Sequence, residues 1–168
     1  EISKFIHDEN PTMIEVELKD LKAILSDVVI NDEVEWSVER DPSTLLQEYI
    51  VQIDRFVSDR VLGKIDDFNM RSLAQSTGKK KFKPIQISDT GLECIEYLSL
   101  DCTSNDGEWH SDSEIKIDKK GYITVNGNET KDFWDGTIRA ENEPLRLKIR
   151  NICGDESIIE LKTKLIYR

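Results

Sequence analysis

Apolar and polar residues alternate most clearly between Pro144 and Leu161. Three apolar side chains alternate with three cations there, and the two sets are Leu145, Leu147 and Ile149 against Arg146, Lys148 and Arg150. A period of two puts the sets on opposite faces of an extended chain, which is typical of a half-buried strand. Turn-forming residues interrupt the pattern at 151–156, and it resumes at 157–161. The pattern predicts a strand, a turn and a second strand.

The rest of the C-terminal half has the same texture of short apolar runs between Gly, Asn and Asp turns. The further predicted strands cover 85–87, 93–101, 114–118, 122–125 and 163–167. Ser104–Gly107 and Asn126–Asn128 are typical of hairpin turns. About seven short strands at this spacing indicate an antiparallel, immunoglobulin-like β-sandwich.

The first half of the chain has a different pattern. Val34, Trp36 and Val38 alternate with polar residues and predict a short strand. Apolar residues at helical spacing then run from Asp41-Pro42, a favourable helix start, to Gly63, a favourable stop. They predict an amphipathic helix whose apolar face packs on the β half or, alternatively, on a partner helix.

These patterns predict an α+β protein in two parts. Residues 1–75 are expected to be a mixed α/β, mainly helical acidic region, which includes a second helical pattern at 18–25. Residues 84–168 are expected to form the antiparallel β-sandwich. The polar, lysine-rich segment 76–83 between them reads as a flexible basic linker.

Composition changes this picture mainly through charge. The 168 residues are enough for one domain or two small ones, and no apolar run is long enough to span a membrane. The net charge of −11 is uneven, because residues 1–70 hold 17 acids and 7 bases, whereas residues 71–168 hold 17 acids and 16 bases. An acidic first half is repelled by phosphates, so strong binding to DNA by this chain alone is not expected.

The cysteines and the first residue bear on the cell compartment. Cys94, Cys102 and Cys153 are odd in number and widely spaced, so we expect reduced thiols in a cytoplasmic protein and no zinc site. The chain begins Glu-Ile-Ser-Lys, without Met and without a signal peptide. A fragment of a longer protein is one explanation for this start, and a trimmed tag is another.

Two groups of cations are candidates for contact with a partner or a phosphate group. The first is the alternating set Arg146, Lys148 and Arg150, and the second is Lys79, Lys80 and Lys81 in the linker. The alternative for the strand is a solvated face with Glu156 or Glu160 as cross-strand partners. The alternative for the linker is a solvated segment, because Gly78 and the lysines lack the spacing of a phosphate-binding loop.

No catalytic residues are predicted. The adjacent acids Asp66-Asp67 and Asp155-Glu156 occupy expected turns, where such residues are ordinary. His110 has no matching nucleophile in the sequence. Four acids near one hairpin, Asp101, Asp106, Glu108 and Asp112, are a possible calcium site, but their spacing is not that of an EF-hand loop. Trp109 and the Phe133-Trp134 pair are expected in the core rather than on a ligand platform.

The order of features in residues 90–165 resembles a known family. Leu100-Asp101 leads to Asn-Asp-Gly-Glu-Trp at 105–109, and Leu-Lys-Ile-Arg-Asn-Ile-Cys-Gly-Asp-Glu follows at 147–156. This order resembles the C-terminal domain of the modification methyltransferases of type III restriction–modification systems. Members of that family methylate the exocyclic amino group of adenine in DNA and use S-adenosylmethionine.

The resemblance implies a non-catalytic role for this chain. The family's Asp-Pro-Pro-Tyr motif and its Phe-x-Gly-x-Gly cofactor loop are both absent, and Asp41-Pro42-Ser43-Thr44 is not a substitute. The resemblance therefore implies an accessory domain that binds no cofactor itself and contacts other subunits of a methyltransferase or restriction complex, or flanking DNA. Two alternatives stay open: a free-standing β-sandwich that recognises a protein or glycan, and a metal-dependent hydrolase that uses the acidic hairpin around Asp106.

Overall fold

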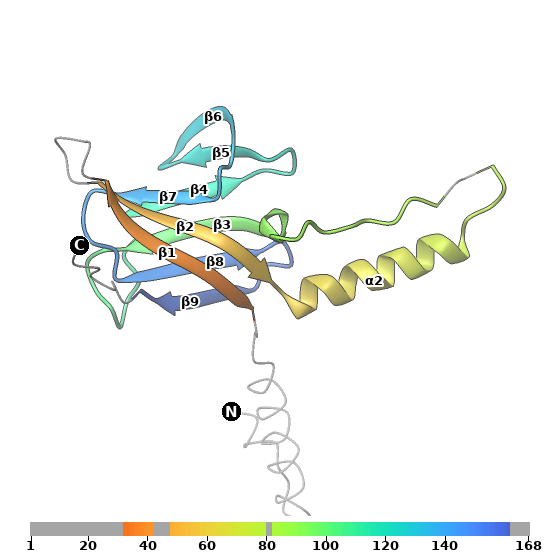
Figure 1. Cartoon of the computed structure of the whole chain (residues 1–168), viewed down its shortest axis with the longest axis horizontal. Helices are drawn as coiled ribbons and strands as arrows, with labels where there is room; N and C mark the ends of the chain where they lie inside the picture. Colours follow the sequence, from red (N-terminus) through yellow and green to blue (C-terminus); the bar gives the residue numbers. More distant parts are fainter. Residues whose placement is uncertain (1–31, 42–47, 80–81, 162–168) are drawn as a thin grey trace, which may run out of the picture. The chain divides into compact units, whose positions relative to one another are not determined.

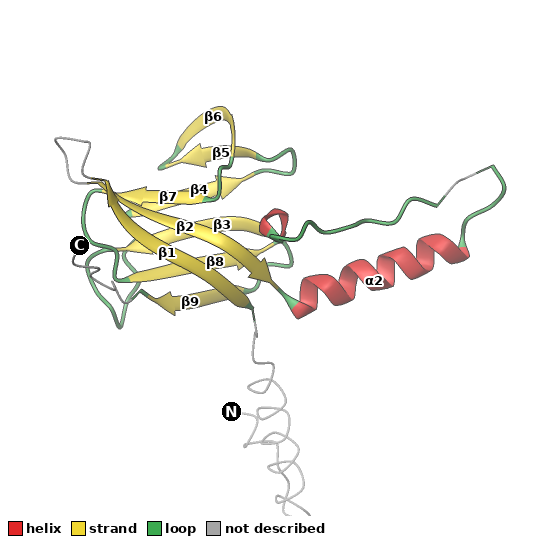
Figure 2. Cartoon of the chain, in the orientation of Figure 1, coloured by secondary structure: helices red, strands yellow, loops and turns green. Residues whose placement is uncertain are grey.

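The computed structural model describes residues 32–41, 48–79 and 82–161, which belong to one compact unit. Two antiparallel sheets make up this unit (Figures 1 and 2). The strands are β1 (Glu33–Asp41), β2 (Glu48–Val57), β3 (Ile95–Asp101), β4 (Ser113–Ile117), β5 (Tyr122–Val125), β6 (Asn128–Phe133), β7 (Thr137–Ala140), β8 (Arg146–Asn151) and β9 (Glu156–Glu160). A helix, α2 (Asp59–Ala74), and a short 3-10 helix, η2 (Leu92–Cys94), complete the described part.

The smaller sheet has the strand order β1-β2-β7. The predicted strand around Trp36 is confirmed as β1, which pairs antiparallel with β2. β2 pairs on its other side with β7, for example Val51 with Ile138. One sheet therefore joins strands from the first half of the sequence to a strand from the second half.

The predicted helix over 42–63 is wrong. Residues 48–57 form strand β2, which places Val51, Ile53 and Phe56 in the core. The apolar residues of this segment suit both periods, but several are β-branched, and pairing with β1 and β7 selects the extended chain. Asp41 ends β1 instead of capping a helix, and residues 42–47 lie outside the described part.

Helix α2 begins later than the sequence predicts and continues through Gly63. Its N-cap is Ser58, whose hydroxyl accepts a hydrogen bond from the Val61 N–H at 3.4 Å. Val61 is the one buried residue of this helix. Further along, the Asn69 amide pairs with both backbone groups of Ile85 at 2.9 and 3.0 Å, which ties α2 to the returning chain.

The larger sheet has the strand order β6-β5-β4-β3-β8-β9. The strand–turn–strand prediction for 144–161 is confirmed as β8 and β9. The predicted turn at Asn126-Gly127 is also confirmed, and both residues have positive φ, 48° and 81°, as a tight hairpin requires. The hairpin predicted around Ser104–Gly107 is present, since β3 and β4 pair antiparallel, but the long loop 102–112 joins them in place of a tight turn.

The core lies between the two sheets. β2 and β7 contribute Val51, Ile53 and Ile138, and the facing side of the larger sheet contributes residues such as Leu98, Leu100, Ile115, Leu147 and Ile149. The α+β prediction is therefore wrong, since α2 is the only α-helix in the described residues and both sheets are antiparallel. Three and six strands also differ from the four and three of an immunoglobulin constant domain.

Two predicted elements lie outside the described residues: the helix at 18–25 and the strand at 163–167. Within the described part of the chain, no helix is both long enough and apolar enough to cross a membrane.

Candidate functional site

The predicted cations of β8 lie on the outer face of the larger sheet. Leu147 and Ile149 point into the core, so Arg146, Lys148 and Arg150 point away from it. Arg146 is only 5% exposed, because its guanidinium donates to the Asp101 carboxylate at 2.8 and 3.0 Å. It also donates to the carbonyl oxygens of Gly107 and Glu108. The long loop 102–112 thus folds over the sheet and encloses Arg146.

Asp101 anchors the loop 102–112 by accepting hydrogen bonds from its backbone. Its carboxylate is fully buried and accepts hydrogen bonds from the backbone N–H groups of Thr103, Ser104 and His110. Burial alone would raise the pKa of Asp101, but these three donors and Arg146 outweigh it and lower the pKa to about 2. Asp101 therefore carries a full negative charge at neutral pH as a structural anion.

The other two cations of the set also have partners within the chain. Arg150 donates to Glu96 at 2.9 Å, lies 3.7 Å from Glu156 and stacks over the Tyr97 ring. The Lys148 ammonium lies 4.5 Å from the centre of the Trp109 ring. A cross-strand partnership with Glu156, one alternative from the sequence, is thus present for Arg150.

The predicted aromatic core is correct only in part. Trp134 packs against the core, and its indole N–H donates to the Thr137 carbonyl oxygen. Trp109 instead lies half-buried on the outer face, where its N–H donates to Ser99. Phe133 is 66% exposed and stacks on Tyr122.

The remaining candidates from the sequence are the lysines of the linker and the acids around Asp106. Lys79 is exposed, and Lys80 and Lys81 lie outside the described residues. Asp112 caps backbone and hydroxyl groups at Cys102 and Thr103 rather than joining Asp101 around an ion. Within residues 32–41, 48–79 and 82–161, no group of three or more His, Cys, Asp or Glu side chains is placed to hold a metal ion.

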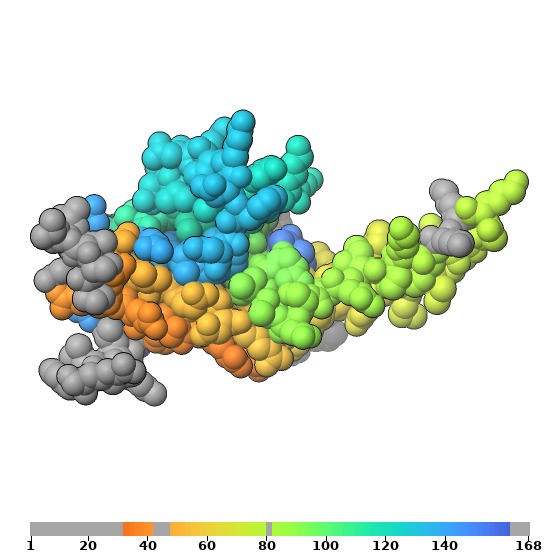
Figure 3. Space-filling model, turned by 45° about the horizontal axis from the view of Figure 1, so that its top comes forward, coloured from red at the N-terminus to blue at the C-terminus, as the bar shows by residue number. Residues whose placement is uncertain are grey.

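A groove that the sequence patterns do not predict lies between the two sheets. Three strands cannot cover six, and the edge strand β7 lies mainly against β3 and β4 of the larger sheet. β5 and β6 extend beyond β7, as the cyan residues in the space-filling view show (Figure 3). The inner face of β4 and β5 is therefore left partly open, and the groove has a volume of about 720 Å³.

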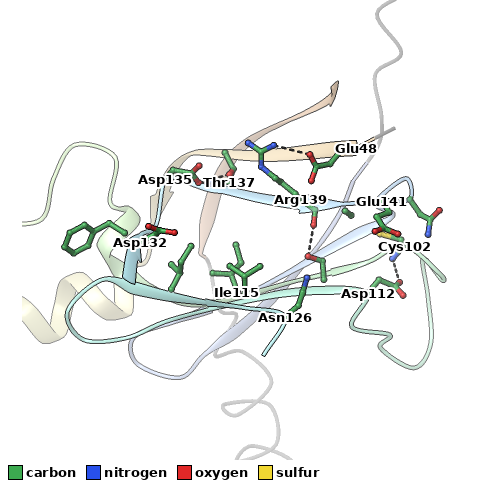
Figure 4. Close-up of a pocket in the computed structure, with 16 residues that line it drawn as sticks. Glu48, Cys102, Asp112, Ile115, Asn126, Asp132, Asp135, Thr137, Arg139 and Glu141 are labelled. Atoms are coloured by element: carbon green, nitrogen blue, oxygen red, sulfur yellow. Dashed lines mark hydrogen bonds and ion pairs between the residues drawn. The ribbon is translucent and has the colours of Figure 1, made fainter. Parts of the chain in front are cut away.

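The groove has an apolar floor and an acidic rim (Figure 4). Ile115, Ile123 and Val125 form the floor. Their side chains point inward because the register of β4 and β5 aligns Ile115 with Val125 on the core side. Five acids and one cation stand around this floor: Glu48, Asp112, Asp132, Asp135, Glu141 and Arg139.

Three of the five carboxylates already have partners. Glu48 pairs with Arg139 at 3.2 Å, Asp135 accepts from Thr137, and Asp112 accepts from Cys102 and Thr103. The carboxylates of Asp132 and Glu141 have no hydrogen bond or ion pair within the described residues. These two acids lie at opposite ends of the groove (Figure 4).

The free edge of β7 borders the groove, and side chains close most of it. The register with β2 turns the backbone groups of Thr137 and Arg139 outward, because the Ile53 N–H donates to Gly136 across the sheet. The Thr137 carbonyl accepts from Trp134, and the Arg139 carbonyl accepts from the Ser113 hydroxyl at 2.7 Å. The Thr137 N–H donates to Asp135. Of the four outward groups, only the Arg139 N–H has no such cap among the described residues.

Among the described residues that line the groove, the thiol is not activated as a nucleophile. Cys102 carries this thiol, and burial, reinforced by the nearby charges of Asp112 and Asp101, raises the pKa of Cys102 to about 11. The thiol is therefore protonated at neutral pH. The described residues that line the groove include no histidine or lysine, and the acids of its rim favour an uncharged or cationic occupant.

Sequence reasoning missed the groove because its residues are scattered over β2, β4, β5, β6 and β7. The one available signal was the inward alternation of Ile123 and Val125 on a strand whose next neighbour, β6, is wholly polar until Phe133.

Comparisons with known proteins give no relative. No family model matches this chain, and no curated protein or solved structure matches it either.

Proposed function

We propose that this chain is a non-catalytic recognition module whose groove binds a cationic segment of a partner protein. The observation that carries the proposal is an open apolar floor with a carboxylate at each end, Asp132 and Glu141, that has no partner in the described part of the chain. Apolar surface left open in a concave site supplies binding energy when it is covered. Free carboxylates select a positively charged occupant and repel an anionic one.

The charge of the whole chain supports a cationic partner. A net charge of −11 attracts basic surfaces over a distance set by the ionic strength and accelerates their encounter. The same charge opposes binding of nucleic acid. A protein segment rich in Lys or Arg satisfies both the local and the overall charge.

This proposal agrees with one part of the family resemblance. An accessory domain of a restriction–modification DNA adenine methyltransferase would act through contacts with other subunits, and an acidic groove suits such contacts. That this chain is a domain of a methyltransferase stays a prediction, which is based on the resemblance of residues 90–165. That prediction expects no binding of S-adenosylmethionine by this chain, and heat released on titration of S-adenosylmethionine into the chain would contradict it.

The proposal is tested by selecting from a random peptide library displayed on phage. We expect the selected peptides to be enriched in Lys and Arg and to contain apolar residues. Their affinity should fall about tenfold or more for the double variant Asp132→Asn/Glu141→Gln, since each change removes one unpaired charge from the groove. A matched control is Glu33→Gln/Glu39→Gln, which neutralises two exposed acids on β1, away from the groove.

Equal affinity for the native chain and the groove variant would overturn the proposal. A loss of affinity in the β1 control as large as that in the groove variant would also overturn it, because general charge rather than the groove would then explain binding. Circular dichroism and unfolding curves for the variants establish that each is folded.

A further inference from the structure

We infer that the groove recognises an extended segment with one cation at each end and uncharged, apolar residues between them, and that it does so through side chains rather than by adding a strand to β7. This inference rests on the proposed function and names the class of segment. It follows from three features of the groove: the positions of its free charges, the state of its strand edge and its single cation.

The free charges define the two ends. Asp132 lies on β6 at one end of the groove, where Asp135 also lies, and Glu141 follows β7 at the other end (Figure 4). The chain from Asp135 to Glu141 takes six residue steps and includes β7 (Thr137–Ala140) and the turn at Gly136, so it spans at most roughly 20 Å. An extended occupant of seven residues is long enough to reach both ends. Its first and last side chains then point to the same side, because six is an even number of steps.

The middle of the groove does not attract a third cation. Arg139 lies on β7 between the two ends, and its guanidinium pairs with Glu48. Beneath it the floor consists of Ile115, Ile123 and Val125. A cation above this floor would lose water contacts and meet an Arg139 charge of its own sign, so apolar residues are favoured there.

The edge of β7 favours recognition through side chains. Addition of a strand requires a row of free backbone N–H and C=O groups. Here Trp134 and Ser113 occupy the two outward carbonyls of β7, and Asp135 occupies one of its two outward N–H groups. An incoming backbone would have to displace three existing hydrogen bonds before it gained its own.

The inference is tested with three synthetic peptides, each acetylated and amidated. The first is Lys-Ala-Val-Ala-Val-Ala-Lys, which places both ammonium groups and both valines on one side of an extended chain. The second, Lys-Lys-Val-Ala-Val-Ala-Ala, has the same composition and charge but adjacent lysines. The third is the first peptide with its three alanine nitrogens methylated, which removes backbone donors while keeping the side chains.

Binding is measured by isothermal titration at low ionic strength, because exposed charges dominate the contact. We expect the first peptide to bind about tenfold more tightly than its isomer, and the methylated peptide to bind within about twofold of the first. Asp132→Asn and Glu141→Gln, tested singly, should each weaken the first peptide more than the isomer, since only the first peptide reaches both ends.

The outcomes separate the inference from the function on which it rests. Equal binding of the two isomers, with both dependent on Asp132 and Glu141, would overturn the spacing and leave the proposed function standing. Loss of binding on methylation would overturn side-chain recognition and point to strand addition at β7. If none of the peptides bound, or if binding were indifferent to both acids, the inference and the proposed function would fall together.

Discussion

The outer face of the larger sheet carries cations that have partners within the chain. The groove on its inner side carries carboxylates, two of which have no partner among the described residues. On the outer face, Arg146 and Arg150 are paired with carboxylates, and Lys148 lies over Trp109. In the groove, Asp132 and Glu141 have no partner among the described residues. The cations of the outer face therefore interact within the chain, whereas two acids of the groove remain available to a partner.

This difference distinguishes charges that stabilise the fold from charges that are available to bind a partner. A buried, paired charge contributes to folding because loss of its partner leaves an isolated ion. An exposed, unpaired charge contributes little to folding and remains available to a partner. Alternation in the sequence draws attention to the cations of β8, but the acids of the groove are better placed to make outside contacts.

The largest expected effect on stability comes from substitution of Asp101, the partner of Arg146 on the outer face. Asp101→Asn leaves the Arg146 guanidinium buried without its counter-charge, and we expect the free energy of unfolding to fall by about 3–5 kcal/mol. Urea unfolding followed by tryptophan fluorescence measures the change. Glu108→Gln is the matched control, since this exposed acid lies in the same loop and should cost less than about 0.5 kcal/mol. A loss below about 1 kcal/mol for Asp101→Asn would show that the pair does not hold the loop.

Acid should have the next largest effect. The pKa of Asp101 is about 2 in the folded chain, below its ordinary value of 3.8. Its stabilising contribution is therefore complete above pH 4 and is lost as the pH falls from about 4 to about 2, by roughly 2 kcal/mol. Other carboxylates titrate in the same range, so the measurement is the difference between the unfolding free energies of native chain and Asp101→Asn from pH 2 to pH 5. A difference that did not shrink toward pH 2 would contradict the low pKa.

Charge reversal in the groove should leave stability nearly unchanged and should weaken peptide binding. Asp132→Lys/Glu141→Lys changes the net charge from −11 to −7, since each substitution adds two positive charges. We expect the unfolding free energy to change by less than about 0.5 kcal/mol, while binding of the lysine-ended heptapeptide weakens by about tenfold or more. Thermal unfolding and isothermal titration on the same samples measure both quantities. A large loss of stability would place these acids among the structural charges instead.

The smallest effect is expected at Lys148. Lys148→Met removes the ammonium group from the Trp109 ring, and we expect a cost of about 0.5–1 kcal/mol. Peptide binding in the groove should be unchanged. Retention of a duplex DNA by the native chain that Lys148→Met abolished would instead restore the outer face as a phosphate-contacting surface.

The strands that the sequence predicts well are those with a single periodicity. Leu145, Leu147 and Ile149 alternate without interruption, so β8 follows from the sequence. In β2, the apolar residues Tyr49, Ile50 and Val51 are consecutive and fit a helix as well as a strand. The partners β1 and β7 decide between them, and β7 lies about ninety residues away in the sequence.

The charges were harder to assign than the strands. The partner of Arg146 is Asp101, which is 45 residues distant and held in place by three backbone donors of a loop. The groove depends on the numbers of strands in the two sheets, which no local pattern contains. Charge alternation identified the outer face of β8 correctly but could not show that its cations already had partners within the chain.

We propose that the groove, and not the cationic outer face, binds a partner. The most direct test is titration of the ¹⁵N-labelled chain with the peptide Lys-Ala-Val-Ala-Val-Ala-Lys, followed by amide chemical shifts. We predict that the largest shifts fall on Ile123, Val125 and Arg139. Larger shifts at Tyr97, Lys148 and Ile158 on the outer face, or no shifts at all, would contradict the claim.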